Sequence, residues 1–241
     1  MKYILITGSS RGLGFQIAKE LSHIGFQIIL VSKDRKNLKK AIEKLNPDLK
    51  HLIFSIDLTK KNSIKKLLEK IADLKIHSII HNFGIKLDND IHPIDVNLLR
   101  KSIEINFIKS LEINNALVDS LCGNPSKIIY IGSSASLHAK ASPCYTLSKS
   151  LINTYVKNIS SFYIDKNVSI CAILPGILGH KGSEWDKKKK EESEKYYDVM
   201  KKQPLKRFIM PEDISPYIID LISNESFLHT GSIIKLDANL Y

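Results

Sequence analysis

The fold of this chain is predicted most clearly by its first residues, Tyr3-Ile4-Leu5-Ile6-Thr7-Gly8-Ser9-Ser10-Arg11-Gly12-Leu13-Gly14. The first half of this stretch is a short apolar run typical of a buried strand, and its second half is a glycine-rich turn. Glycine lets a backbone approach a phosphate closely, and a helix that starts here offers free N–H groups to a diphosphate. Because the turn follows a strand and opens a helix, it predicts a dinucleotide-binding unit. The absence of a following Gly-Lys-Ser/Thr sequence excludes a Walker A loop.

Short apolar runs alternate with longer amphipathic segments along the rest of the chain. The apolar runs predict strands at Tyr3–Thr7, Gln27–Val31, His51–Ser55, Ser78–His81, Lys127–Ile131, Val168–Leu174 and Ser232–Leu236. The amphipathic segments predict helices at Gly12–Ile24, Asp34–Leu45, Lys60–Leu74, Leu98–Leu121, Pro143–Tyr163 and Pro211–Ile222. Thr59 is the expected N-cap of the third of these helices. We therefore expect one domain over residues 1–241, with an α/β doubly wound Rossmann fold. Its parallel seven-stranded sheet would carry helices on both faces.

One polar segment, residues 179–204, interrupts this alternation. It contains the only tryptophan, Trp185, the basic run Lys187–Lys190 and three nearby glutamates. A run of mixed charge is typical of a solvated helix. The alternative is a mobile lid over a substrate, and both interpretations stay open at the level of sequence.

Composition excludes several classes of protein. The chain has 241 residues, of which 43% are apolar and 25% charged, close to the globular average. Its apolar runs are far shorter than the ~20 residues that span a bilayer, and its first strand leads straight into the glycine turn. We therefore expect no membrane segment and no signal peptide. Three cysteines in a long chain predict reduced thiols and a cytoplasmic location.

The net charge of +11 raises the question of nucleic acid, but only four of the basic residues are arginines. The lysines are scattered, and few aromatic residues lie among them to stack on bases. No specific nucleic-acid binding is expected. The spacing of His81, His92, His138 and His180 matches no zinc pattern, so no metal site is expected either.

The end of the second strand, Val31-Ser32-Lys33-Asp34, bears on the choice of dinucleotide. In dinucleotide folds an acidic residue here binds the ribose 2′-hydroxyl of NAD. Ser32 is neutral and Lys33 is cationic, and Arg11 lies in the turn beside the same ribose. These residues favour a 2′-phosphate, and hence NADP(H) over NAD(H). Asp34 is the competing feature, because an inward-pointing Asp34 would reverse the preference.

A set of polar residues suited to hydride transfer lies further along the chain. Tyr145 and Lys149 are i and i+4 on a predicted helix, so they share one face. A nearby ammonium and a cationic nicotinamide would stabilise a phenolate and lower the tyrosine pKa toward neutrality. Ser133 ends the fifth strand, where ligands bind in doubly wound sheets, and its hydroxyl can donate to a carbonyl oxygen. No His–Asp pair at matching strand ends would make this serine a nucleophile, so a hydride-transfer site fits better than a hydrolase.

Together these motifs resemble the short-chain dehydrogenase/reductase family, over nearly the whole chain. The family's Thr-Gly-x-x-x-Gly-x-Gly motif matches residues 7–14, and its Tyr-x-x-x-Lys pair matches Tyr145 and Lys149. Further correspondences are Asp57 for the adenine-contacting aspartate, His81-Asn82-Phe83-Gly84 for Asn-Asn-Ala-Gly, Asn106 for the active-site asparagine, Ser133 for the active-site serine and Pro175-Gly176 for the Pro-Gly after the sixth strand.

The resemblance implies roles for these positions. Ser133 would orient the substrate oxygen, Tyr145 would exchange a proton with it, Lys149 would hold the nicotinamide ribose, and Asn106 would support a water that relays the proton. The implied cofactor-binding residues are Gly8, Ser10, Arg11, Gly12, Leu13, Gly14, Ser32, Lys33, Asp57, Leu58, Asn82, Gly84, Tyr145, Lys149, Pro175, Gly176 and Ile177.

The implied reaction interconverts a ketone and a secondary alcohol with NADP(H), on a small-molecule or carrier-linked carbonyl substrate. A reductase of 3-oxoacyl groups on acyl carrier protein is one expectation. Reductases of sugars or small ketones, and a non-catalytic NADP(H)-binding regulator, are the alternatives. The family also implies a homodimer or homotetramer.

The chain departs from the family pattern at several positions. Ser133 lies twelve residues before Tyr145, one fewer than in many members, so Ser134 is an alternative acting serine. Phe83 replaces the usual alanine. His180 stands where a threonine often touches the nicotinamide carboxamide.

Overall fold

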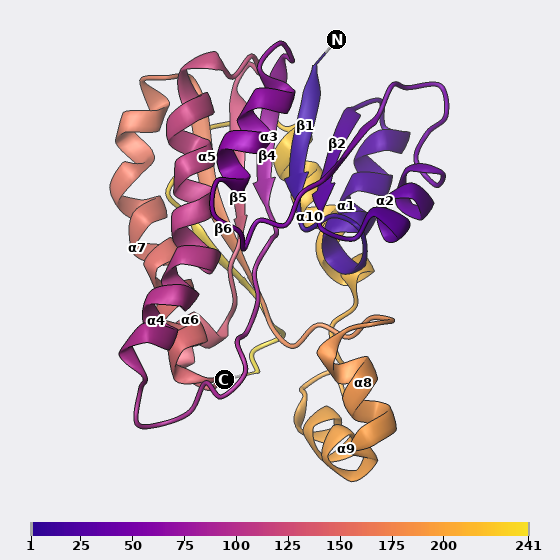
Figure 1. Ribbon diagram of the computed structural model, residues 1–241, viewed down its shortest axis with the longest axis vertical. Coiled ribbons are helices and arrows are strands. Elements are labelled where there is room, and N and C mark those ends of the chain that lie inside the picture. The colour runs from indigo at the N-terminus through magenta and orange to yellow at the C-terminus, as the bar shows by residue number, and fades with distance from the viewer. Residues whose placement is uncertain (1, 241) are drawn as a thin grey trace.

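The computed structural model describes residues 2–240 and contains, within that range, a parallel sheet of seven strands (Figure 1). The strands are β1 (Tyr3–Thr7), β2 (Gln27–Ser32), β3 (Leu52–Ser55), β4 (Ile76–His81), β5 (Ser126–Ile131), β6 (Val168–Pro175) and β7 (Ile233–Leu236). They lie side by side in the order β3-β2-β1-β4-β5-β6-β7, and every pairing is parallel. The predicted doubly wound α/β fold is confirmed.

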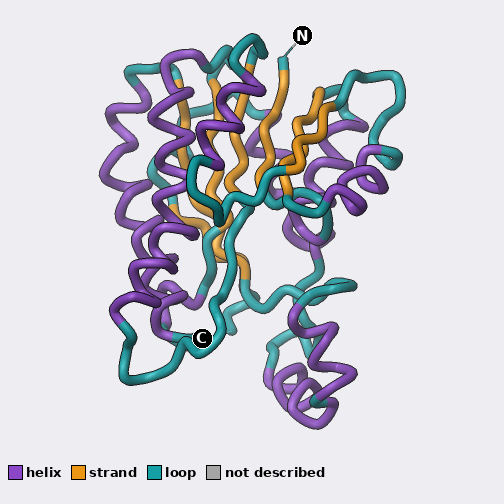
Figure 2. Tube along the Cα trace, viewed as in Figure 1, coloured by secondary structure: helices purple, strands orange, loops and turns teal. Residues whose placement is uncertain are grey.

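Helices cover both faces of the sheet (Figure 2). One face carries α3 (Ser63–Ile71), α4 (Val96–Ile103), α5 (Lys109–Leu117) and α7 (Pro143–Ile164); the other carries α1 (Gly12–His23), α2 (Arg35–Ile42) and α10 (Pro211–Ser223). Alternate residues of β1 enter opposite cores: Leu5 packs on the first face and Ile6 on the second, both fully buried. This double burial explains why the strands read as continuous apolar runs.

The connections reverse direction between β1 and β4. From β1 the chain adds β2 and β3 on one side, and from β4 it adds the remaining strands on the other. In such sheets the carboxyl ends at the reversal border a ligand crevice. Thr7 ends β1 and joins the two sides, because its Oγ1 accepts hydrogen bonds from Asn82 N (3.2 Å) and Phe83 N (3.1 Å) just after β4.

The helix predicted over Leu98–Leu121 is interrupted. It consists of α4, a π-helical turn (Glu104–Ile108), α5 and a 3-10 turn (Val118–Ser120). The π turn carries Asn106, whose side chain binds the backbone of Ile85. Turns of this type inside α-helices often mark functional positions.

The proposed N-cap of the third helix was wrong. Thr59 does not cap it, because its hydroxyl donates to Asp57 Oδ1 at 2.7 Å and its N–H to the same oxygen at 3.0 Å. The helix α3 starts later, at Ser63, after Asn62 in the left-handed region (φ 61°). The aspartate therefore competes successfully for the threonine that the sequence pattern assigned to the helix.

The polar segment 179–204 folds into α8 (Glu184–Glu191) and α9 (Ser193–Lys202), and within the described chain neither helix contains a buried residue. Both extend away from the sheet in Figure 1. The solvated-helix interpretation is confirmed, and the lid role stays a prediction. A short helix, α6 (Ala135–His138), was not predicted. Nowhere in residues 2–240 does a helix have both the length and the apolar character needed to cross a membrane.

Candidate active site

A cleft runs along the carboxyl ends of the strands on both sides of the reversal point. Most of the residues expected to bind the cofactor or substrate line it: Gly8, Ser10, Arg11, Leu13, Ser32, Lys33, Asp57, Leu58, Asn82, Gly84, Ser133, Tyr145, Lys149, Pro175 and Gly176. Of the other expected residues, all within the described chain, Gly12, Gly14 and Ile177 do not line the cleft, and Asn106 lines a smaller neighbouring pocket. The structure therefore brings together residues from both halves of the sequence.

The glycine turn forms one wall of the cleft. Gly8 and Gly12 have positive φ angles of 66° and 58°, which disfavour a side chain. A Cβ on Gly14 would collide with Asn82 Nδ2, which itself donates to Gly8 O at 2.9 Å. Arg11, the N-cap residue of α1, makes no side-chain capping bond within the described chain, so the first N–H groups of α1 can bind an anion. These residues fit the diphosphate of a dinucleotide.

The end of β2 carries the residues expected to distinguish a 2′-phosphate from a 2′-hydroxyl on the ribose of the dinucleotide. Ser10 Oγ and Ser32 Oγ are hydrogen-bonded at 2.9 Å, and Arg11 and Lys33 line the cleft beside them. The Asp34 carboxylate instead accepts bonds from Asn37 N (2.9 Å) and Asn37 Nδ2 (2.6 Å). Asp34 is thus occupied as the N-cap of α2. The inward orientation that would reverse the cofactor preference is not found.

Tyr145 and Lys149 lie on one face of α7 and line the same cleft as the glycine turn. Burial raises the pKa of Tyr145 above its usual value, and a hydrogen bond with Ser133 offsets part of that rise. The Lys149 Nζ lies 6.0 Å from the centre of the Tyr145 ring and donates to Ile131 O at 3.0 Å. Burial lowers the pKa of Lys149 to about 8. Burial and Ser133 account for the Tyr145 pKa in the protein by itself, and the expected lowering by Lys149 together with a cationic nicotinamide stays a prediction.

The two candidate serines differ in position. Ser133 lines the cleft and is the serine that bonds to Tyr145. Ser134 is 2% exposed, and its N–H donates to Pro175 O at 2.9 Å. Only the first of these hydroxyls is placed to reach a ligand in the cleft.

Asn106 is fully engaged with the segment that follows β4. Its Oδ1 accepts from Ile85 N at 2.8 Å, and its Nδ2 donates to Ile85 O at 3.0 Å. Further bonds at 3.2 Å join Nδ2 to Ser102 Oγ and Ser148 Oγ. The side chain thus ties the π turn to the segment after β4 and to α7.

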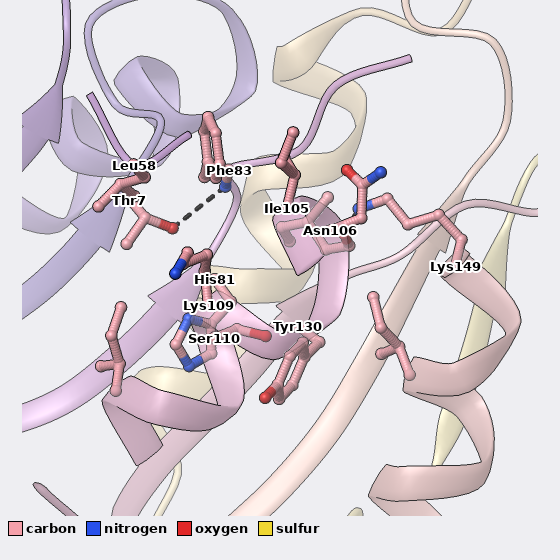
Figure 3. A pocket seen from close by; sticks show the side chains of 13 residues that line it. Thr7, Leu58, His81, Phe83, Ile105, Asn106, Lys109, Ser110, Tyr130 and Lys149 are labelled. Carbon is pink, nitrogen blue, oxygen red and sulfur yellow. Dashed lines mark hydrogen bonds between the residues drawn. The ribbon is translucent and has the colours of Figure 1, made fainter. Parts of the chain in front are cut away.

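Lys149 also borders a second, smaller pocket next to the cleft (Figure 3). Thr7, His81, Tyr130 and Lys149 are among the residues that surround it. His81 Nε2 is 2.7 Å from Asn114 Oδ1, and burial lowers the His81 pKa to about 4, so the imidazole is neutral. The sequence placed this histidine in the His81-Asn82-Phe83-Gly84 motif but did not predict its contact with Asn114. Residues 2–240 contain no group of three or more His, Cys, Asp or Glu side chains that could hold a metal ion.

Three residues of the cleft, Leu178, Trp185 and Lys187, were not among those expected to bind the cofactor, and the last two come from the first turns of α8. Phe83, which replaces the usual alanine of the motif after β4, lines the cleft as well. His180 also lines it, but its ring lies against Gly12 in the glycine turn. That position is beside the diphosphate-binding wall, whereas the family pattern placed this residue at the nicotinamide. Sequence alone had no signal for this, because the path of the segment after β6 depends on tertiary packing.

Residues 2–192 match the family model described as short chain dehydrogenase. The chain belongs to the short-chain dehydrogenase family. This confirms the resemblance drawn from the motifs. The protein is accordingly an oxidoreductase that acts on CH–OH or C=O groups with NAD(P).

Individual proteins resemble the chain over its full length. A 3-oxoacyl-[acyl-carrier-protein] reductase from Buchnera aphidicola is 28% identical over 243 residues, covering 98% of this chain and 96% of the relative. The structure of L-sorbose reductase from Gluconobacter frateurii, complexed with NADPH and L-sorbose, superposes with a TM-score of 0.90 at 21% identity, over 99% of this chain and 96% of that one. A 3-oxoacyl (acyl-carrier-protein) reductase from Agrobacterium tumefaciens with NADP bound has a TM-score of 0.85 at 18% identity, over 98% and 93% of the two chains.

Proposed function

We propose that this short-chain dehydrogenase is an NADP(H)-dependent reductase that interconverts a ketone and a secondary alcohol. The observation that carries the proposal is the convergence of Ser133, Tyr145 and Lys149 in one cleft with the glycine turn of α1. The turn suits a diphosphate, and the three polar side chains suit a carbonyl group and a ribose. One ligand lying along this cleft would touch both.

The preference for NADP(H) is supported by the charges around the end of β2. Arg11 and Lys33 supply two cations to the part of the cleft that follows β2, and Asp34 is turned into the first turn of α2. A 2′-phosphate would gain from both cations, whereas a free 2′-hydroxyl would lack its usual carboxylate acceptor. The NADPH and NADP bound to the two structural neighbours agree with this preference.

The roles that we propose follow from the geometry of the side chains. Bound NADPH would supply a hydride to the carbonyl carbon. Ser133 donates a hydrogen bond to the carbonyl oxygen, and Tyr145 donates its proton to the same oxygen. A phenol with a raised pKa is protonated at neutral pH, which is the state that reduction requires. Lys149 holds the nicotinamide ribose.

Asn106 takes a different role from the one that the family resemblance implied. Because both polar atoms of its amide are bonded to Ile85, we propose that it fixes the cleft wall after β4. The relayed water would then lie in the smaller pocket that Lys149 borders.

For the substrate we propose a 3-oxoacyl group on an acidic carrier. The full-length likeness to a 3-oxoacyl-[acyl-carrier-protein] reductase supports this class, and the net charge of +11 suits an acidic partner. Lys187 and Trp185, which line the cleft, would contact the carrier-linked acyl group as it binds. Assembly as a homodimer or homotetramer, implied by the family, stays a prediction.

A panel of carbonyl compounds tests activity, cofactor and substrate class together. Oxidation of NADPH and of NADH would be followed with 3-oxoacyl thioesters, keto sugars and small ketones. We expect NADPH oxidation, fastest with the thioesters. If keto sugars are reduced faster than the thioesters, the substrate class is a keto sugar. If NADH is oxidised faster than NADPH, Lys33 does not favour NADP(H). Tight NADPH binding without turnover of any carbonyl would instead favour a cofactor-binding regulator.

A further inference from the structure

The helix that carries Tyr145 is capped from outside its own sequence. Ser142 is the N-cap residue of α7, and among the described residues its side chain makes no capping bond to the helix. Asp90 takes its place: Oδ1 accepts from Cys144 N at 2.7 Å, and Oδ2 accepts from Tyr145 N at 2.9 Å. The first of these bonds spans 54 residues of sequence. A distant carboxylate thus satisfies two N–H groups that helix ends leave without partners.

The environment of Asp90 keeps it ionised. The residue is 5% exposed. Burial opposes the charge, but hydrogen bonds from the first turn of α7, led by the Cys144 N–H, lower the pKa of the carboxyl group overall. The positive end of the α7 dipole adds to this preference for an anion. Consistently, burial and the Asp90 charge raise the pKa of the Cys144 thiol to about 11.

The segment that contains Asp90 also forms the cleft wall. Gly84 and Ile85 line the cleft, and Asn106 holds Ile85 through both of its backbone polar groups. The segment from Gly84 to Asp90 is therefore fixed at one end to the π turn and at the other end to Tyr145. Displacement of either end would change the distance between the tyrosine and the ligand beside it.

We propose that Asp90 is a positioning residue, which holds the Tyr145 backbone in register with Ser133 and the cleft wall. This inference rests on the proposed function, because positioning matters only if Tyr145 meets a substrate. Asp90 would act through the contact between the segment after β4 and α7. In the described chain it does not line the cleft, so we propose no contact between Asp90 and substrate or cofactor.

Asp95 provides a matched control. Its Oδ1 accepts from Asn97 N at 2.7 Å and Leu98 N at 3.2 Å, so it caps α4 with the same chemistry. It is the local N-cap of its own helix, and that helix does not carry Tyr145. Replacement of either aspartate removes a helix cap, but only replacement of Asp90 should move the tyrosine.

The test compares Asp90→Ala, Asp90→Asn and Asp95→Ala. For each variant, kcat and KM with the best carbonyl substrate, the NADPH Kd from the fluorescence of Trp185 and the amide hydrogen exchange of residues 144–146 are measured. Small errors of placement cost up to about 100-fold in rate, so we expect kcat to fall about 10- to 100-fold in Asp90→Ala. Asp90→Asn keeps one hydrogen-bond acceptor, so its kcat should fall less than that of Asp90→Ala. NADPH Kd should stay within about twofold in all three variants, as should kcat in Asp95→Ala, because a lost cap there leaves Tyr145 in place.

Two results would overturn the inference. One is a loss of kcat in Asp90→Ala no larger than in Asp95→Ala, and the other is unchanged exchange of the amides at 144 and 145. If Asp90→Ala does not fold, Asp90→Asn carries the same comparison. Failure of the proposed function is a different observation: the wild type itself would turn over no carbonyl compound.

Discussion

Replacement of Lys149 by methionine should stabilise the fold while it abolishes turnover. Lys149 is 3% exposed, and burial lowers its pKa from 10.5 to about 8. At 1.36 kcal/mol per pKa unit, keeping it protonated at neutral pH costs about 3 kcal/mol of folding free energy. Methionine removes that cost, but it also removes the hydrogen bond from the ammonium to Ile131 O, which is worth about 1.5–3 kcal/mol. We therefore expect a net gain of up to about 1.5 kcal/mol.

The pH dependence of this gain has a definite sign. The unfolded lysine holds its proton up to about pH 10.5, whereas the folded one loses it near pH 8. The penalty is therefore complete below pH 8 and declines as the pH rises toward 10.5. Urea unfolding of the wild type and of Lys149→Met at pH 7 and pH 9.5 measures the difference in their free energies of unfolding. The advantage of the variant should be larger at pH 7.

Lys109→Met is the control, because Lys109 is a buried lysine with partners. Its Nζ lies 2.6 Å from Glu104 Oε1 and 3.4 Å from Glu112 Oε2. Burial opposes the charge, but the hydrogen bonds and charges of Glu104 and Glu112 together raise the Lys109 pKa. Lys109→Met should thus lower the free energy of unfolding by about 1 kcal/mol. Destabilisation by Lys149→Met, or an advantage that grows from pH 7 to pH 9.5, would show that the buried ammonium does not cost folding free energy.

Two further substitutions test the cofactor site. Lys33→Asp should shift the ratio of kcat/KM values from NADPH toward NADH by at least about tenfold, because it replaces a cation of the cleft by a carboxylate; an unchanged ratio would show that Lys33 does not face the 2′-position. Gly14→Ala should weaken NADPH binding by at least about tenfold, because its Cβ displaces the Asn82 amide from Gly8 O; an NADPH Kd within twofold of the wild type, measured by Trp185 fluorescence, would contradict that packing argument.

The sheet and the cofactor wall were predictable because local pattern determines them. The run before Thr7 is apolar at every position, which is what double burial requires, and Gly8 and Gly12 have the positive φ angles that disfavour side chains. The spacing of Tyr145 and Lys149 likewise fixes their shared helix face without tertiary information. For such features, neighbours in sequence are also neighbours in space.

Most of the features that the sequence did not predict depend on contacts between residues far apart in the chain. The π turn at Asn106 accompanies hydrogen bonds to Ile85, 21 residues away, and α7 is capped by Asp90 rather than by its own Ser142. The raised pKa of Tyr145 follows from burial, which residue spacing does not reveal. Thr59 is the exception: it was expected to cap the third helix, but Asp57, only two residues earlier, accepts the hydrogen bond from its hydroxyl.

The measurement that tests the proposed mechanism most directly is the turnover of Tyr145→Phe. The substitution removes only the phenolic oxygen, so NADPH should bind with a Kd within about twofold of the wild type, while kcat for carbonyl reduction falls at least about 100-fold. Tyr217→Phe is the control, because Tyr217 is an exposed tyrosine of α10, and its kcat should not change. A Tyr145→Phe variant that reduces the same substrate at the wild-type rate would show that this phenol donates no proton.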